Sequence, residues 1–327
     1  MRLLKIVPDN TNIQFVRIRH IAFAITALLT VAALALVFTR GLNMGVDFAG
    51  GVSIEEKFTT EPSIDAVRST VNGLGLGEAA LQQLGGANTV TIRLPLPESA
   101  DPAAVDQMVE KVKTALAAKF PGASFSNYST VSGKVSDELI WNGVLAVILA
   151  IVGIAIFSWF RYEWQFGVST AVAIIHDVLM TLGFFALFRE LFTFDLNIVA
   201  AVLTIIGYSI NDKMVIDDRI RENMRKFRKM EMRDLIDLSV NETLPRTVMT
   251  SVTIMLALAA LLIWGGHVLR GFTAAMMLGI VVGTYSSIYV SSSLLISLGL
   301  KPGFREAKNA AAEAENTAER VSPRTKS

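Results

Sequence analysis

Six long apolar stretches constrain the fold of this 327-residue chain more than any other feature. A helix needs about 20 mainly apolar residues to cross the hydrocarbon core of a bilayer. The stretches that approach or exceed this length are 20–38, 139–160, 166–188, 196–217, 247–264 and 272–298. Arg17 and Arg19 precede the first stretch, as in a signal peptide, but its length and the five later spans favour a retained helix. The sequence therefore predicts a polytopic α-helical membrane protein with six transmembrane helices and excludes a purely soluble enzyme.

Lysine and arginine in the short connections predict the orientation, because such residues favour the cytoplasmic side. Basic residues lie before the first span, at Arg161, through 219–246 and after the last span, whereas the other short connections hold only Arg189 and Arg270. We therefore expect both termini on the cytoplasmic side. The cytoplasmic segments are then an N-terminal stretch at 1–19, a basic loop at 218–246 and a tail at 299–327, and residues 41–137 form a domain on the opposite side of the membrane.

The composition of 41–137 is that of a soluble domain, and its pattern alternates between strands and helices. Strands are predicted at 51–59, 79–84, 89–94 and 123–131, and helices at 62–72 and 101–120. Asp101-Pro102 is a typical helix start. The order β-α-β-β-α-β is that of a ferredoxin-like α+β domain. We find no nucleophile paired with a base and no phosphate-binding loop here, so we expect a binding or mechanical module.

Ionisable residues inside a span are costly and are candidate functional sites. In the fourth span, Tyr208 and Asp212 share one helix face, and Asn211 precedes the aspartate. Burial penalises the charge of such a carboxylate and a nearby cation stabilises it, so it can bind and release a proton near neutral pH. Arg246, at the start of the fifth span, is the candidate counter-charge. The alternative is a structural aspartate held by hydrogen bonds between helices.

His176 and Asp177 form a second intramembrane polar pair, for which a packed structural role is an equally good interpretation. Lys213 is expected to extend to the inner membrane surface. Asp217 is expected at that surface without a buried partner. In the sixth span, Gly279 and Gly283 predict close packing against another helix. The basic segment 219–246 is helical in pattern, and we expect it to end at Pro245.

The absence of cysteine excludes disulfides, thiolate metal sites and cysteine nucleophiles. We also predict no metal site, no cofactor and no nucleic-acid partner. The chain is expected not to be an enzyme.

Several motifs resemble one known family. They are GLNMGVDFAGG at 41–51, GKVSDEL at 133–139, VAAVLTIIGYSINDKMVIDDRIREN at 199–223, IHD at 175–177 and NETLPRTVMTS at 241–251. Together they resemble the SecF branch of the SecD/SecF family of bacterial protein translocase subunits, within the resistance–nodulation–division superfamily. The resemblance covers most of 15–300. Lys213-Met214 departs from it, since a small or β-branched polar residue such as Thr is expected there.

The resemblance implies a location in the bacterial inner membrane, with 41–137 in the periplasm. It also implies a function in protein export across this membrane, in which the protein acts with a SecD partner and uses the proton motive force. The further partners it implies are the SecYEG channel, SecA, YajC and YidC, with an unfolded preprotein on the periplasmic side. It assigns proton coupling to Asp212 and Arg246. It also assigns coupling between the first span and the outer domain to a motif that contains Gly45, Asp47, Phe48, Gly50 and Gly51.

Two other functions remain open at this point. One is a proton-coupled half-transporter of the same superfamily that exports lipids or small molecules. The other is an intramembrane aspartyl protease that uses Asp177 and Asp212, although neither aspartate follows the Gly-x-Gly sequence usual for such enzymes.

Overall fold

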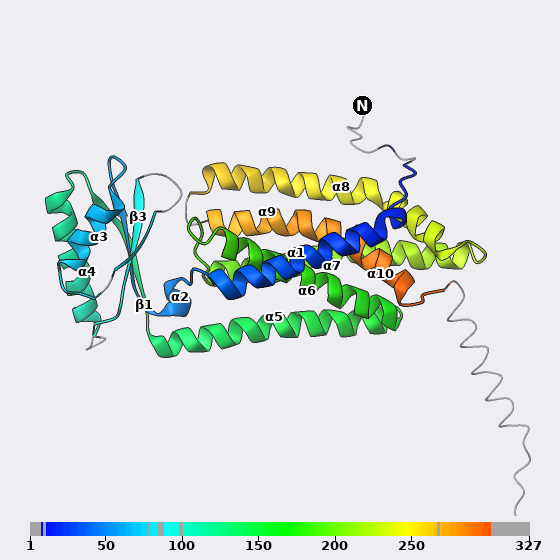
Figure 1. Ribbon diagram of the computed structural model, residues 1–327, viewed down its shortest axis with the longest axis horizontal. Coiled ribbons are helices and arrows are strands. Elements are labelled where there is room, and N and C mark those ends of the chain that lie inside the picture. The colour runs from blue at the N-terminus through cyan, green and yellow to red at the C-terminus, as the bar shows by residue number, and fades with distance from the viewer. Residues whose placement is uncertain are drawn as a thin grey trace, which may run out of the picture.

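The computed structural model describes residues 8, 11–77, 79–83, 88–97, 101–266 and 269–301. Parts of the predicted cytoplasmic segments 1–19 and 299–327 lie outside these residues. In the described part of the chain, a helical bundle carries a small α+β domain at one end. The start of α1 and the turn between α7 and α8 lie at the other end (Figure 1). We call residues 51–131 the sheet domain and refer to its end of the bundle as the outer end.

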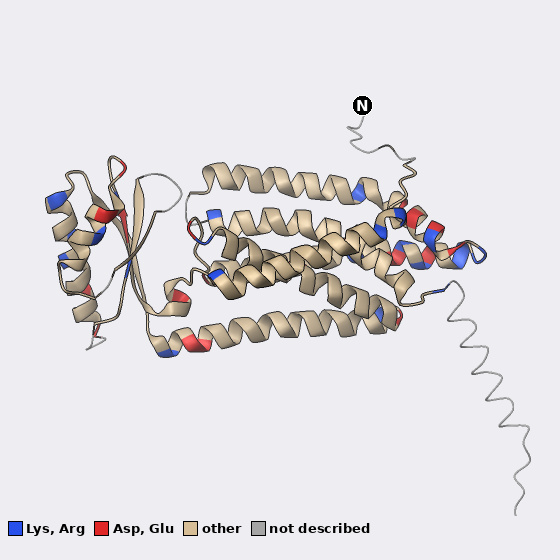
Figure 2. Ribbon diagram, in the orientation of Figure 1, with Lys and Arg blue, Asp and Glu red and all other residues tan. Residues whose placement is uncertain are grey.

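Six helical stretches are long and apolar enough to cross a membrane, as the sequence predicts. Five are α1 (Arg19–Arg40, preceded by the short turn η1, Val16–Ile18), α5 (Gly133–Arg161), α6 (Trp164–Leu187), α7 (Leu196–Lys226) and α8 (Met232–Trp264). The sixth consists of α9 (Arg270–Tyr285), a π-helical turn η2 (Ser286–Ser291) and α10 (Ser292–Ser297). Charged residues gather at the two ends of the molecule, and few lie along the middle of the bundle (Figure 2).

The sheet domain follows the predicted order of elements. These are β1 (Gly51–Lys57), α3 (Ile64–Asn72), β2 (Ala80–Gln83), β3 (Thr89–Leu94), α4 (Pro102–Lys119) and β4 (Ser124–Val131). The strands form one antiparallel sheet in the order β2-β3-β1-β4, in which Ile54 of β1 lies opposite Ile92 of β3. Because strand side chains alternate between faces, Val52 and Ile54 enter the core with α3 and α4, while Ser53 and Glu55 line the face toward the bundle.

Helix α7 is the centre of the bundle and packs against α5, α6, α8 and α9. Its contact with α9 depends on glycine: a Cβ on Gly279 would lie 2.4 Å from a side-chain carbon of Ile205, and one on Gly283 would lie 3.2 Å from Cβ of Ser209. The predicted close packing at these glycines is confirmed.

The prediction that the basic helical segment ends at Pro245 is wrong, because α8 runs through this proline. Proline removes one hydrogen bond, the one its N–H would give to the carbonyl of Asn241. The turns on either side keep their bonds, and Leu235, Ile236 and Val240 pack into a buried cluster. The basic segment at 218–246 is mostly helical, in line with its sequence pattern, and only a short connection joins α7 to α8.

Candidate functional site in the helical bundle

Asp212 is buried in α7, with 3% of its surface exposed. Among the described residues, no hydrogen bond reaches its Oδ2 atom. Its carboxyl interacts with the Thr284 side chain of α9 and, through charge, with Arg246 of α8. The structure thus places the two residues predicted for proton coupling within electrostatic range of each other, on neighbouring helices.

A chain of hydroxyl groups runs beside this carboxyl. The Tyr208 hydroxyl lies 2.9 Å from Oγ of Ser251, which lies 3.1 Å from Oγ1 of Thr284. These residues belong to α7, α8 and α9, so the chain of hydroxyl groups joins the three helices around Asp212. Hydroxyls both donate and accept, and such a chain can reorient when the protonation of a neighbouring carboxyl changes.

Asn211 and Arg246 lie on the exposed surface of the bundle, unlike Asp212. Thr204, two turns before Asp212, is also exposed, and Tyr208 is half-buried. The polar face predicted for α7 therefore begins at the surface and becomes buried at Asp212.

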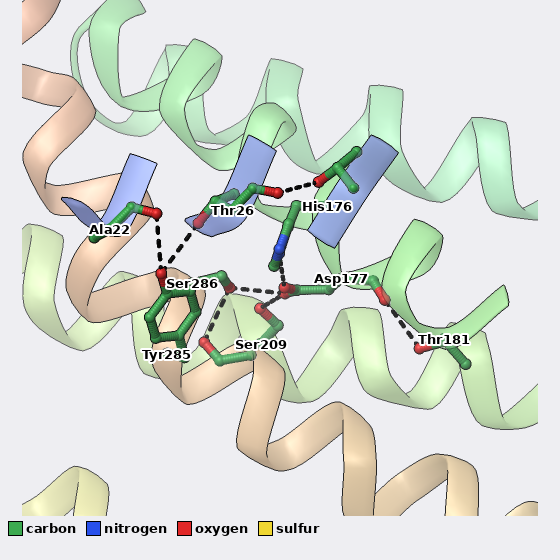
Figure 3. A network of polar contacts seen from close by, with 10 residues as sticks. Ala22, Thr26, His176, Asp177, Thr181, Ser209, Tyr285 and Ser286 are labelled. Atoms are coloured by element: carbon green, nitrogen blue, oxygen red, sulfur yellow. Dashed lines mark hydrogen bonds and ion pairs between the residues drawn. The ribbon is translucent and has the colours of Figure 1, made fainter. Parts of the chain in front are cut away.

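Asp177 forms a separate buried cluster on α6 (Figure 3). It has no exposed surface, and its Oδ2 accepts hydrogen bonds from Ser209 at 2.6 Å and Ser286 at 3.0 Å. Nδ1 of His176 lies 3.2 Å from Oδ1. The cluster therefore ties α6 to α7 and to the first residue of the π-helical turn. Turns of this kind are frequent at functional sites.

Lys213 and Asp217 contradict the expectation that both lie at the membrane surface. The ammonium of Lys213 lies 2.8 Å from both carboxylate oxygens of Asp217, and the two residues are 2% and 1% exposed. Phe166 of α6 covers the lysine, with its ring centre 6.0 Å from Nζ. The spacing of four residues stacks the two side chains on one face of α7, and that face is covered by α6 rather than by lipid headgroups. The next residue, Asp218, is exposed, and its Oδ1 lies 3.4 Å from Nη2 of Arg161.

The predicted coupling motif lies at the outer end of α7. Oδ2 of Asp47, in the short helix α2 (Val46–Ala49), accepts a hydrogen bond from the backbone N–H of Leu196, the first residue of α7. Phe48 packs against Phe194, with ring centres 5.8 Å apart. The backbone N–H of Gly45 bonds the carbonyl of Phe194 at 2.8 Å. The motif thus joins the helix that carries Asp212 to the entrance of the sheet domain.

Two glycines of the motif adopt backbone conformations that favour glycine. Gly50 has φ of +70° and Gly51 has φ of +110°. A Cβ on Gly51 would lie 2.5 Å from the carbonyl oxygen of Leu94. These positions allow the chain to turn sharply from α2 into β1.

Asp195 completes this end of α7 as its N-cap, since its Oδ1 accepts from the N–H of Ile198 at 3.1 Å. Burial raises the pKa of its carboxyl, and its hydrogen bonds oppose that effect. Asp195 is not among the residues predicted from the sequence, although an aspartate before an apolar helix is a recognisable cap signal. Ser251 and Thr284 are not among them either, because a single sequence offers no signal for them beyond a hydroxyl in a span.

The described residues contain no group of three or more His, Asp or Glu side chains that could hold a metal ion. The arrangement offers instead one incompletely bonded carboxyl, a nearby cation and a hydroxyl chain. This chemistry suits reversible protonation coupled to helix movement. Asp177 and Asp212 contact different side chains, in contrast to the shared pocket that an aspartyl protease requires.

Fold and site together define a polytopic membrane protein whose six-helix bundle contains buried charged groups and carries an α+β domain between its first two spans. The chain belongs to the SecD/SecF family. The C-terminal region of the protein export membrane protein SecD/SecF family matches residues 111–301, and the SecD/SecF GG motif matches residues 35–59.

Individual relatives agree with this assignment. The chain is 41% identical to protein translocase subunit SecF of Rhodobacter capsulatus over 91% of this chain and 92% of that protein. It is also 41% identical to SecF of Pseudomonas aeruginosa, over 88% and 92% of the two chains. The crystal structure of SecDF, a translocon-associated membrane protein from Thermus thermophilus, superposes with a TM-score of 0.81 at 34% identity and covers 90% of this chain. The match spans 39% of the length of that longer SecDF chain.

Proposed function

We propose that this protein is a SecF-type subunit of the Sec preprotein translocase. In this proposal it acts with a SecD partner to promote protein export, using the proton motive force. The observation that carries the proposal is the buried carboxyl of Asp212. Its Oδ2 has no hydrogen-bond partner among the described residues, and the carboxyl interacts with Arg246 and Thr284. Protonation of this carboxyl changes the charge between α7, α8 and α9. The hydroxyl chain from Tyr208 to Thr284 then rearranges with it.

The coupling motif transmits this change toward the sheet domain. Asp212 lies on α7, and Asp47 accepts a hydrogen bond from Leu196, the first residue of the same helix. A shift of α7 along its axis therefore displaces α2 and the start of β1. We assign proton coupling to Asp212 and Arg246 and mechanical coupling to the Gly45–Gly51 motif.

The sheet domain is ferredoxin-like and periplasmic in this proposal. Its element order and its strand order β2-β3-β1-β4 support the first assignment. The basic residues around the α7–α8 connection, at the opposite end of the bundle, support the second, because they favour the cytoplasmic side. Both termini are then cytoplasmic, the membrane is the bacterial inner membrane, and an unfolded preprotein is handled on the periplasmic side.

The SecD partner docks on the face formed by α7 and α8. Thr204, Asn211 and Arg246 are exposed there, although they belong to membrane-spanning helices. Polar groups facing lipid are costly, and a partner that offers polar or small side chains removes that cost. We assign SecYEG, SecA, YajC and YidC as further partners on the family resemblance alone.

Preprotein release from membrane vesicles with an imposed proton gradient tests the function. Asp212→Asn should abolish the gradient-dependent part of release and leave assembly with SecD intact. Asp218→Asn is the matched control, because Asp218 lies on the same helix but is exposed. Full gradient dependence in Asp212→Asn would refute the coupling role. Co-purification with a lipid or small molecule but without a Sec channel would favour the half-transporter instead.

A further inference from the structure

A partly buried polar cluster joins the sheet domain to the bundle at a place outside the glycine motif. We call Asn43, Gln82, Arg93 and Thr193 the polar junction. Asn43 follows α1, Gln82 belongs to β2, Arg93 belongs to β3, and Thr193 lies in the connection between α6 and α7. None of these residues belongs to the sites predicted from the sequence.

The side-chain carbonyl of Gln82 is the centre of the junction. Its Oε1 accepts hydrogen bonds from Nη2 of Arg93 at 2.6 Å, from Oγ1 of Thr193 at 2.6 Å and from Nδ2 of Asn43 at 2.9 Å. Gln82 is 7% exposed. One buried oxygen therefore connects two strands of the sheet to two separate segments of the membrane-spanning part.

Arg93 adds further bonds to the same segments. Its Nη2 lies 3.1 Å from Oδ1 of Asn43, and its Nη1 donates to the carbonyl of Met44. Burial lowers the pKa of the guanidinium, but arginine stays charged at physiological pH. Hydrogen bonds from a charged donor are roughly twice as strong as neutral ones. The planar fork of Arg93 thus holds the segment after α1 against β3.

Main-chain bonds continue the junction to the start of α7. The N–H of Phe194 bonds the carbonyl of Asn43 at 2.8 Å, and Nδ2 of Asn43 bonds the carbonyl of Arg189 at 2.9 Å. Asp195, the N-cap of α7, follows directly. Beside the junction, a cleft of about 520 Å³ separates the polar face of the sheet from the outer ends of α7 and α9, and it is lined by Arg93, Thr193, Ser53 and Asn197 among others. Next to this cleft, the junction connects β2 and β3 to the bundle through direct hydrogen bonds.

We propose that the polar junction is a rigid joint that makes the sheet domain move together with the outer end of α7, with Arg93 as its positioning residue. The joint adds a second attachment, from β2 and β3, to the one that Asp47 makes from α2. With two attachments, a displacement of α7 carries the sheet domain as one body instead of bending the chain at Gly50 and Gly51. This inference rests on the proposed function in that protonation supplies the displacement.

Spin-label distance measurements on the full chain in lipid vesicles test the rigidity without any transport assay. The chain contains no cysteine, so labels can be attached at Arg68→Cys in α3 and Glu190→Cys in the loop before α7, both exposed positions. We expect a narrow distance distribution in the native background and one about twofold broader with Arg93→Met, because several partly buried hydrogen bonds are lost together. Arg93→Lys keeps the charge but not the fork, and should give an intermediate width. Lys119→Met removes an exposed cation of the same domain and should give the native width.

An unchanged width in Arg93→Met would overturn the joint. If Arg93→Met is poorly folded, a second variant tests whether a covalent link can replace the junction. In it, Gln82→Cys and Thr193→Cys are combined with Arg93→Met, and the two cysteines are linked by a short bifunctional thiol reagent. Linking should restore gradient-dependent preprotein release, whereas release that stays low after linking would refute a rigid joint. Preprotein release from vesicles with Asp212→Asn separates a failure of the rigid joint from a failure of the proposed function. If release in that variant still depends on the proton gradient, the proposed function is wrong, but the distance measurements on the joint remain valid.

Discussion

The hydroxyl of Ser209 donates a hydrogen bond of 2.6 Å to Oδ2 of Asp177 and thereby joins α7 to α6 three residues before Asp212. The same oxygen accepts from Ser286, two residues after Thr284, which interacts with Asp212. The Asp177 cluster therefore fixes α7, which carries the proposed proton-coupling carboxyl, and the π-helical turn that follows Thr284. We propose that it sets the geometry around Asp212.

Removing the Asp177 carboxyl should destabilise the bundle. In Asp177→Ala, the hydroxyl of Ser209 and Nδ1 of His176 lose their buried partner, and each unsatisfied group costs about 1–3 kcal/mol. The hydroxyl of Ser286 can still donate to the carbonyl of Gly283, which lies 3.1 Å away. We expect a loss of about 3 kcal/mol in the free energy of unfolding. Ser209→Ala removes only one donor and should cost about 1 kcal/mol. Reversible unfolding in detergent micelles measures both, and equal losses would show that the shared acceptor is not the source of the stability.

The buried pair of Lys213 and Asp217 leads to a prediction about charge. Lys213→Met leaves the Asp217 carboxylate buried without its cation, which should cost about 3–5 kcal/mol. The double variant Lys213→Met/Asp217→Leu removes both charges and should recover most of that loss, because two apolar side chains of similar volume replace a buried ion pair at little cost. The comparison uses the free energy of unfolding of the two variants. A double variant as unstable as the single one would mean that packing, rather than the unpaired charge, is responsible.

A glycine substitution tests the turn into the sheet domain. Gly51→Ala should destabilise the domain by about 3 kcal/mol, since the position combines a positive φ with a backbone oxygen in the space of the new Cβ. Gly75→Ala is the matched control, because Gly75 has φ of +67° but nothing within 4 Å of the added carbon. It should cost about 1 kcal/mol. Hydrogen exchange of β1 amides measures the difference, and similar protection in both variants would contradict it.

The sequence predicts the six spans and the order of strands and helices well, because apolar length and strand alternation are local properties. The partners of Asp177 could not be predicted, since Ser209 and Ser286 lie 32 and 109 residues away and meet it only through helix packing. Lys213 was placed wrongly for a related reason. Its spacing to Asp217 allows an ion pair, but burial of that pair depends on Phe166 of α6. Pairings between helices decide what a single sequence leaves open.

Glu56 makes the stability of the sheet domain depend on pH. It lies on the core side of β1, is 1% exposed, and its Oε1 has no hydrogen-bond partner among the described residues. Burial raises the pKa of its carboxyl from 4.5 to about 7, and Lys113 of α4 partly opposes the shift. The folded state therefore binds the proton more tightly than the unfolded state. The stability contributed by the protonated form is complete below pH 4.5 and is lost as the pH rises to about 7.

Glu56→Gln should remove this dependence, because the amide stays neutral at every pH. At pH 8 the variant should be more stable than the native chain by about 2 kcal/mol, less than the full pKa difference implies, since relaxation around the ionised carboxylate recovers part of the cost. Hydrogen exchange of β1 and α4 amides, compared between variant and native chain at each pH, measures the gap. Asp65→Asn, at an exposed carboxylate of α3, should show no such gap. The gap should shrink toward zero as the pH is lowered to 5, and a gap that stays constant between pH 5 and pH 8 would show that Glu56 does not titrate in this range.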